Sequence, residues 1–322
     1  MGELVSSLPD QTYPCLNLND HTLDENLPVS EHYPLQSNRT QPVARAGTLD
    51  SLPLELIHKI LCQLDVRTLS DFRATNRRAT ELVDTLPQYK AIITHARNAL
   101  RGILSIQTGR WITCRTLYQK LCTPQCEHCG DFAGYLYLLT CKRVCFLCFT
   151  KNDLYLPLPP GRACRKFGLT RQIVQTLPLM TVIPGIYSPN EKKAPKRVLV
   201  DYEASLYAGI KLHGSRNAMN QYIADREAEL ATRQSTSTGR RRRVPVADHF
   251  DGESGNPFRF VAISFVPQLV KTSRDVERGF HCAGCRKSMD LPSHCRRKFT
   301  TASFEAHLKQ FGRIKHENHH LD

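Results

Sequence analysis

The segment Leu49–Val83 constrains the fold most, because its residue order predicts three short helices separated by tight breaks. Pro53 lies in the first turn of the first helix, where its missing N–H leaves no hydrogen bond unmade. Asp65 or Thr68 can cap the second helix, and Asn76 can cap the third. We therefore expect a small helical unit in the first third of the chain.

Apolar residues in this unit recur at three- and four-residue steps, which places them on common helix faces. A unit of about 35 residues is too short to bury so much apolar surface by itself. The sequence therefore predicts that the rest of the chain or a partner covers part of this surface. The residues concerned are Leu52, Pro53, Leu56, Ile57, Ile60, Leu61, Leu64, Leu69 and Phe72.

The order of these residues resembles the F-box, with Leu-Pro at 52–53, Glu-Leu-Ile at 55–57 and Ile-Leu at 60–61. The resemblance implies that residues 49–83 dock onto the Skp-type adaptor of a cullin–RING (SCF-type) ubiquitin ligase. The nine apolar residues above would then form the adaptor contact. The chain would be a substrate-receptor subunit that binds an unknown protein substrate and does no chemistry itself.

Two Cys-x-x-Cys pairs predict a metal site: Cys126 with Cys129, and Cys145 with Cys148, with fifteen residues between the pairs. Two residues between ligands let both thiolates reach one ion from a tight turn. We expect one structural zinc ion here, since four thiolate ligands leave no open position for catalysis. Three nearby residues are alternative ligands: Cys122, Cys141 and His128.

A third Cys-x-x-Cys pair, Cys282 with Cys285, predicts a second zinc site near the C-terminus. A short helix downstream carries His307, and His316 follows after eight further residues. Two cysteines with two histidines are a common coordination set for zinc, so these four residues are the predicted ligands. The fourth position stays open, with Cys295 and His294 as alternatives.

Three further segments extend the resemblance beyond the helical unit. They are TCKRVCFLCF at 140–149, LPLPPG at 156–161 and LPLMTVIPGIYS at 177–188. These segments resemble those of fungal F-box proteins that carry a cysteine-rich region directly after the box. The resemblance implies that most of the chain follows the organisation of that group.

The chain carries a formal net charge of +14, although residues 1–46 are acidic on balance. Such a charge favours an acidic protein partner or nucleic acid, so a zinc-containing nucleic-acid-binding regulatory protein is the alternative function. The basic run Arg240–Arg243 can be a nuclear import signal or a solvated loop. The basic residues around the C-terminal cysteines are Arg286, Lys287, Arg296, Arg297, Lys298, Lys309, Arg313 and Lys315.

No apolar run in the sequence is long enough to span a bilayer, and no charged-then-apolar leader is present. We therefore expect an intracellular protein, in the cytoplasm, the nucleus or both, without membrane association. The 13 cysteines would then stay mostly reduced, which favours metal binding over disulfides. A glycine-rich phosphate loop and a nucleophile elbow are both missing, so no enzyme activity is predicted.

These observations predict a mainly α fold, with a three-helix F-box, further helices and small zinc-stabilised α+β elements. Residues 1–46 form a disordered tail in this prediction, and residues 47–86 form the F-box. Residues 87–189 form a helical region with the four-cysteine site, and apolar residues over 89–104 predict one long helix within it. Residues 190–322 form a C-terminal region with the basic loop and the second zinc site.

Overall fold

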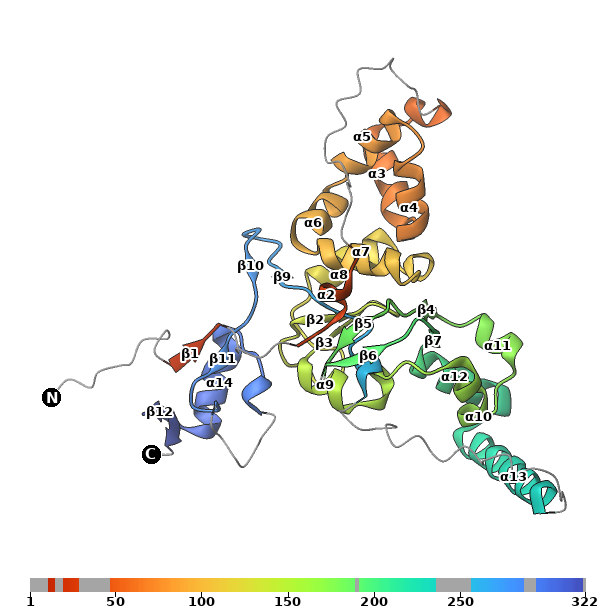
Figure 1. The fold of residues 1–322 in the computed structure, drawn as a ribbon. Coiled ribbons are helices and arrows are strands. Elements are labelled where there is room, and N and C mark those ends of the chain that lie inside the picture. The colour runs from red at the N-terminus through yellow and green to blue at the C-terminus, as the bar shows by residue number, and fades with distance from the viewer. Residues whose placement is uncertain are drawn as a thin grey trace.

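The computed structural model describes residues 11–14, 20–28, 47–188, 191–235, 256–286 and 294–320. Within these ranges the chain is mainly helical, and its strands form small sheets of two or three members (Figure 1). This arrangement confirms the predicted fold class, mainly α with small α+β elements. Over the same ranges, no helix combines the length and the apolar character that crossing a membrane requires.

A run of helices follows residue 53, and local caps fix where two of them begin. The Asp65 carboxylate accepts a hydrogen bond from the Thr68 amide (2.9 Å), and Asn76 Oδ1 accepts one from the Ala79 amide (2.8 Å). These bonds satisfy amides that a first helical turn leaves unpaired. The helices are α3 (Leu54–Gln63), α4 (Val66–Arg73), α5 (Arg77–Thr85), α6 (Pro87–His95), α7 (Arg97–Ser105) and α8 (Cys114–Leu121), with short 3-10 turns at Gly47–Ser51 and Gly109–Trp111.

Helices α6 and α7 divide the segment that was predicted to form one helix over 89–104. Ala96 joins them with φ −135° and ψ 34°, outside the helical region. Its amide still donates to the Ile92 carbonyl (2.8 Å), so α6 closes normally before the chain turns. Ile92, Ala96 and Leu100 are all buried. The single long helix is therefore wrong, although the apolar face is buried as its pattern predicts.

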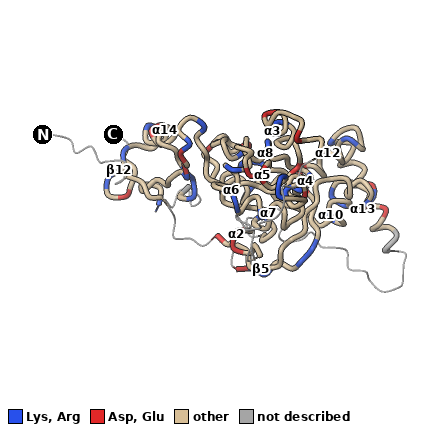
Figure 2. Tube along the Cα trace, turned by 90° about the horizontal axis from the view of Figure 1, so that it is seen from above, with Lys and Arg blue, Asp and Glu red and all other residues tan. Residues whose placement is uncertain are grey.

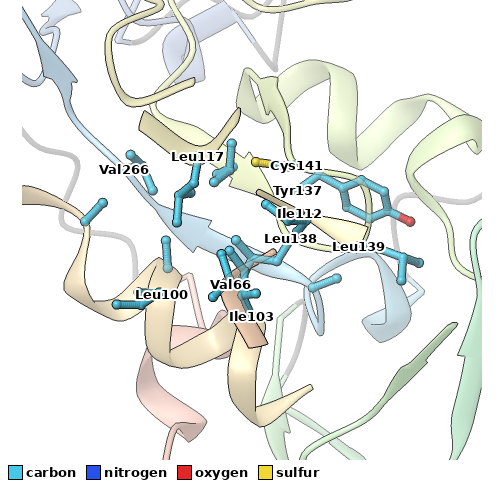
Figure 3. Packing of buried hydrophobic residues seen from close by; sticks show 14 of the residues in the cluster. Val66, Leu100, Ile103, Ile112, Leu117, Tyr137, Leu138, Leu139, Cys141 and Val266 are labelled. Atoms are coloured by element: carbon cyan, nitrogen blue, oxygen red, sulfur yellow. The ribbon is translucent and has the colours of Figure 1, made fainter. Parts of the chain in front are cut away.

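The largest apolar core joins these helices to a three-stranded antiparallel sheet. Strand β2 (Tyr135–Tyr137) lies at its centre, between β3 (Lys142–Val144) and β8 (Ile263–Phe265). Figure 3 shows Ile103 and Leu117 meeting Leu138 and Val266 within this core. The N-terminal helices are thus packed against a strand from the second half of the chain.

A second, smaller core forms on the far side of the sheet from the F-box-like helices. Its buried members include Leu158, Phe167, Val200 and Met219, and partly buried residues of the helix Tyr202–His213 pack against them. The elements of this region are α9 (Phe146–Lys151), η3 (Asp153–Tyr155), α10 (Pro160–Phe167), α11 (Arg171–Gln175), β4 (Leu179–Thr181), β5 (Gly185–Tyr187), β6 (Lys192–Ala194), β7 (Val198–Val200), α12 (Tyr202–His213), α13 (Arg216–Ser235) and η4 (Pro257–Arg259). Strand β4 pairs with β7, and β5 pairs with β6.

The C-terminal residues form a small module with its own apolar cluster. Phe299 and Phe304 are fully buried in this cluster, together with Cys282, Cys285 and Ile314. The helix of this module, Thr301–Phe311, begins with a capping box in which the Thr300 and Ser303 side chains each accept a hydrogen bond from the other residue's backbone amide. The β9 (Gln268–Leu269) and β10 (Val276–Glu277) strands precede the module, and their apolar residues pack in the large core. The elements of the module are β11 (His281–Cys282), η5 (His294–Arg296), α14 (Thr301–Phe311), β12 (Arg313–Lys315) and β13 (Asn318–His320).

Two segments from the predicted disordered tail over residues 1–46 are folded. Strand β1 (Thr12–Tyr13) pairs antiparallel with β11, at the left of Figure 1. Helix α2 (Leu23–Asn26) buries Leu23 completely, and the Asp24 carboxylate accepts hydrogen bonds from Ser264 Oγ (2.6 Å) and the Phe265 amide (2.7 Å). These two segments are therefore part of the fold. Residues 1–10, 15–19 and 29–46 of the predicted tail, and the run Arg240–Arg243, lie outside the described residues.

Candidate functional site

Helix α3 and the residue pair before it expose four large apolar side chains, Leu52, Leu54, Leu56 and Ile60, which together are called the apolar ridge. These side chains are 37%, 46%, 44% and 47% exposed, respectively. Leu56 and Ile60 are four residues apart, so they are neighbours on one helix face. Four large apolar side chains exposed to solvent in one short segment are unusual for a surface that faces only water, and they are typical of a protein contact surface.

The opposite face of α3 is already covered by the chain itself. Ile57 and Leu61 are only 2% and 3% exposed, and they pack in the large core beside α5 and α8. Leu69 on α4 is also buried there. The expectation that a partner contacts these three residues is therefore wrong, because the chain is long enough to supply its own helices for that face.

The nine residues predicted for the adaptor contact thus fall into three groups. Leu52, Pro53, Leu56 and Ile60 are exposed. Leu64 and Phe72 are partly buried and pack against the large core, whereas Ile57, Leu61 and Leu69 are fully inside it. Leu54 is exposed but is not among the nine predicted residues. Leu54 and Ile57 are three residues apart, so helical periodicity places Leu54 on the same, inner face as the buried Ile57.

Hydrogen bonds and an ion pair hold the ridge on a fixed scaffold. The Arg73 guanidinium donates to both Asp84 carboxylate oxygens, at 2.7 and 2.9 Å, and so ties α4 to α5. The Cys114 amide donates to the Leu64 carbonyl (3.1 Å), which ties the end of α3 to the start of α8. Such two-point carboxylate contacts are among the stronger side-chain interactions. The ridge is therefore presented without a need for rearrangement.

The first cysteine cluster brings Cys126, Cys129, Cys145 and Cys148 together, as the spacing predicts. The four Sγ atoms all lie within 4.8 Å of one another. Cys129 Sγ and Cys145 Sγ are 3.6 Å apart, close to the about 3.8 Å edge of a tetrahedron with Zn–S bonds of about 2.3 Å. The β2–β3 hairpin connects the two pairs, and Gly130 turns the chain after the first pair with φ 79°.

Hydrogen bonds from the Cys145 and Cys148 thiols lower the pKa of Cys126 well below its usual value. Burial raises the pKa of Cys129, and hydrogen bonding to Cys126 raises the pKa values of Cys145 and Cys148, so the fit to a metal ion rests on the geometry of the four thiols. Thiolates are the form of cysteine that binds zinc. The residues present therefore fit a closed, four-thiolate structural zinc site.

The three alternative ligands lie outside this cluster. Cys141 is buried at a turn with φ 56°, and burial raises the pKa of its thiol to about 12. Cys122 packs against the large core, and the exposed His128 ring contacts the Asn152 side chain. Cys141 is therefore a small buried group of the core, and the partly buried Cys122 packs against it; neither belongs to the cluster of four thiols.

The second cluster contains Cys282, Cys285, His307 and His319. His319 Nε2 lies 3.3 Å from each of the two Sγ atoms and 3.2 Å from His307 Nε2. A tetrahedral zinc site has S–N edges of about 3.6 Å and an N–N edge of about 3.3 Å. A hydrogen bond from Cys285 lowers the pKa of Cys282 to about 4, which favours its thiolate. This cluster therefore also fits zinc.

The predicted fourth ligand, His316, is wrong, and His319 takes that place. Strands β12 and β13 form a hairpin whose two turn residues, His316 and Glu317, have φ 50° and 60°. His316 is therefore exposed at the tip, whereas His319 pairs with the buried Ile314 in the strands. Among the alternatives, Cys295 is not a member of the cluster, and the side chain of His294 lies outside the described part.

Basic residues of the C-terminal module contact acidic residues elsewhere in the molecule. Arg296 forms an ion pair with Asp20 and lies over the Phe146 ring, 3.6 Å from its centroid. Arg297 forms an ion pair with Asp131 at 2.5 Å. Figure 2 shows Lys and Arg positions spread over many elements, interspersed with acidic ones. Arg296 and Arg297 therefore form ion pairs with acidic residues outside the module.

Comparison with models of protein families finds the F-box domain at residues 49–91. No curated protein and no solved structure matches the chain. The chain therefore carries an F-box domain, and this domain contains α3, α4, α5 and the first half of α6. The domain ends at residue 91, beyond the boundary predicted at residue 86. The apolar ridge lies inside this domain.

Proposed function

We propose that the chain, which carries an F-box domain, is a substrate-receptor subunit of an SCF-type cullin–RING ubiquitin ligase. The apolar ridge of Leu52, Leu54, Leu56 and Ile60 is the surface that docks the Skp-type adaptor, and the adaptor in turn contacts the cullin. One observation carries this proposal. Inside the matched domain, four large apolar side chains are exposed to solvent, while Ile57 and Leu61 of the same helix are buried in the core.

The energetics of the ridge are sufficient for a stable contact. Burying a Leu or Ile side chain contributes about 1.5–3 kcal/mol. In a typical protein interface, a few residues supply most of the binding free energy. The fixed scaffold under the ridge also lowers the ordering cost of binding, because little has to rearrange.

Zinc has a structural role in this proposal. Cys126, Cys129, Cys145 and Cys148 hold one ion, and the Cys282, Cys285, His307 and His319 set holds a second. A bound zinc ion cross-links its four ligands and contributes folding free energy. We also propose that the chain belongs to the group of fungal F-box proteins with a cysteine-rich region, which segments 140–149, 156–161 and 177–188 resemble.

The chain acts here as a non-catalytic, intracellular subunit, and its protein substrate is the unassigned partner. The nucleic-acid alternative has less support, because Arg296 and Arg297 already contact Asp20 and Asp131. A charge that is compensated within the molecule releases few counterions when nucleic acid binds.

The test is co-purification of a Skp-type adaptor and a cullin with the wild-type chain and with a Leu56→Asp, Ile60→Asp variant. Both side chains are exposed, so the substitutions leave the core untouched. Losing two apolar contacts of about 1.5–3 kcal/mol each predicts binding at least a hundredfold weaker.

The matched control is Tyr207→Asp with Leu212→Asp, which changes two large side chains on α12 that are at least as exposed, at 63% and 48%. This control should bind the adaptor as well as the wild type, and all three proteins should melt at similar temperatures. A wild-type chain that never captures the adaptor, or equal binding by the ridge variant, contradicts the proposal.

A further inference from the structure

A cavity of about 290 Å³ opens between the ends of α4 and α5 and the sides of α6 and α7. None of the residues around it belongs to the apolar ridge. Its walls come from Arg73, Asp84, Tyr89, Lys90, Ile93, Thr94, Arg97, Leu100, Arg101 and Leu104. The cavity is therefore a second surface feature of the same helical region, built from different elements.

The floor of the cavity is apolar. Tyr89 and Leu100 are buried beneath it, and the partly buried Ile93 and Leu104 pack against the same core. Side chains in this setting offer contact area without hydrogen-bonding demands, so an apolar group gains free energy by entering. A volume of this size has room for one large aliphatic or aromatic side chain.

The rim of the cavity is strongly basic. Asp84 is the acidic residue among four cationic ones, and both of its oxygens are taken by the Arg73 guanidinium. Arg101 donates to the neutral carbonyl of Pro28 and to Asn98 Oδ1. The charge of Arg101 is thus not offset by either of these contacts.

Lys90 and Arg97 complete the positive rim, and both side chains are exposed. Within the described residues neither side chain takes part in an ion pair. Unpaired cations beside a low-dielectric wall attract an anion more strongly than scattered surface charges do. The cavity thus combines an apolar pocket with an anion-attracting edge.

We propose that this cavity binds an acidic peptide segment that inserts one large apolar side chain, with flanking carboxylates beside Lys90 and Arg97. This inference rests on the proposed function, in which the peptide is the recognition segment of the protein substrate. The apolar floor supplies contact area, and the rim selects segments rich in Asp and Glu. The substrate class is therefore an acidic segment with a Leu-, Met- or Phe-like anchor.

A peptide fits the cavity better than nucleic acid does. Phosphate backbones are bound by rows of cations and polar groups along a groove, and bases stack on exposed aromatic rings. Here the cations surround an apolar hollow, and the one aromatic ring in its wall, Tyr89, is 4% exposed. A single-stranded oligonucleotide is therefore the competitor in the test.

The experiment uses the full chain and a dye-labelled peptide in which one Leu is flanked on both sides by Asp and Glu. Fluorescence anisotropy at moderate salt reports binding. Replacing the peptide's Leu by Gly should weaken binding about tenfold, because one buried anchor is lost. Reversing the rim with Lys90→Glu and Arg97→Glu should also weaken it at least about tenfold.

The matched control reverses two exposed cations outside the cavity, Arg171→Glu and Lys211→Glu, and should bind the peptide like the wild type. The rim-reversed chain should prefer a peptide in which Lys replaces the acidic flanks. As a second variant, Thr94→Trp narrows the cavity from an exposed wall position and should weaken binding without changing the rim charge.

Two results overturn the proposal: equal affinity for the Leu and Gly peptides, or equal peptide binding by the wild-type and rim-reversed chains. Displacement of the peptide by an oligonucleotide, with no effect of the Leu-to-Gly change, assigns the rim to nucleic acid and also overturns it. Adaptor capture is measured on the same proteins. Peptide binding without adaptor capture contradicts the proposed function alone, whereas adaptor capture without peptide binding contradicts the cavity alone.

Discussion

The orientation of the His319 ring is set by its second nitrogen. Nδ1 donates to the Gly312 carbonyl, 3.0 Å away, at the end of α14. This bond leaves Nε2 unprotonated and directed at the two thiols and at His307. Partners of this kind fix the tautomer and the direction of metal-binding histidines in proteins. His319 is therefore prepared to bind a metal before the metal arrives.

The fourth ligand can be identified by counting zinc. We expect His319→Ala to lose one of two zinc ions per chain, because three ligands hold the ion much less tightly. His316→Ala is the matched control, since it removes a histidine from the exposed tip of the same hairpin, and it should retain both ions. Metal analysis of the dialysed proteins gives the counts. The assignment fails if the two variants carry the same amount of zinc.

Cysteine spacing and histidine position differ in how far the sequence alone can predict them. A Cys-x-x-Cys pair needs only one local turn, so the thiol partners could be predicted directly. The choice between His316 and His319 depends on where the hairpin turns. Two-residue hairpin turns with positive φ are usually marked by Asn-Gly, whereas here His316 and Glu317 occupy the turn and give no such signal.

Helix α12 begins on a buried carboxylate. Asp201 accepts hydrogen bonds from the Ala204 amide (2.8 Å) and from the Tyr137 hydroxyl (3.0 Å). Burial raises the pKa of Asp201 from 3.8 to about 6, and the two hydrogen bonds only partly oppose this. The folded state therefore binds a proton that the unfolded state releases near pH 4. As the pH rises from about 4 to about 6, this group lowers the free energy of unfolding.

Asp201→Asn is the variant that isolates this effect, because Asn caps helices equally well but does not ionise. We expect the free energy of unfolding of the variant, relative to wild type, to rise by about 2–3 kcal/mol between pH 4 and pH 7. Urea unfolding at several pH values measures the difference. A constant difference across that range shows that the Asp201 pKa is not raised.

Elements set by neighbouring residues could be predicted, whereas those set by distant contacts could not. The caps at Asp65 and Asn76 act on amides three residues away, so the sequence contains their whole cause. The docking of α2 depends on the sheet against which it packs. For α2 the partner is Ser264 and Phe265, far along the chain, and no local pattern reports such a contact.

The two cysteine-containing clusters belong to different cores of the molecule. Cys126, Cys145 and Cys148 are members of the large core that also contains the F-box helices. Cys282 and Cys285 belong to the small C-terminal cluster with Phe299 and Phe304. Loss of metal from the first site should therefore destabilise the large core, whereas loss from the second should destabilise only the C-terminal module.

Comparing Cys148→Ser with Cys285→Ser tests this division. We expect Cys148→Ser to lower the melting temperature of the whole molecule, because its site lies within the main core and zinc binding supplies folding free energy on the order of 10 kcal/mol. Cys285→Ser should reduce hydrogen-exchange protection in β11, α14, β12 and β13 and leave α3–α8 protected. Loss of protection in α3–α8 in both variants argues against separate cores.

The pairing of β2 with β8 also has a consequence for synthesis on the ribosome. The F-box helices contact one another and α8 locally, so they can form as soon as residue 121 has emerged. Strand β2 keeps an unpaired edge, and α2 lacks its docking partner, until Phe265 has been translated. The apolar ridge is therefore presented on a nascent chain whose second half does not yet exist, and an adaptor bound at that stage would shield it from aggregation while the sheet is completed.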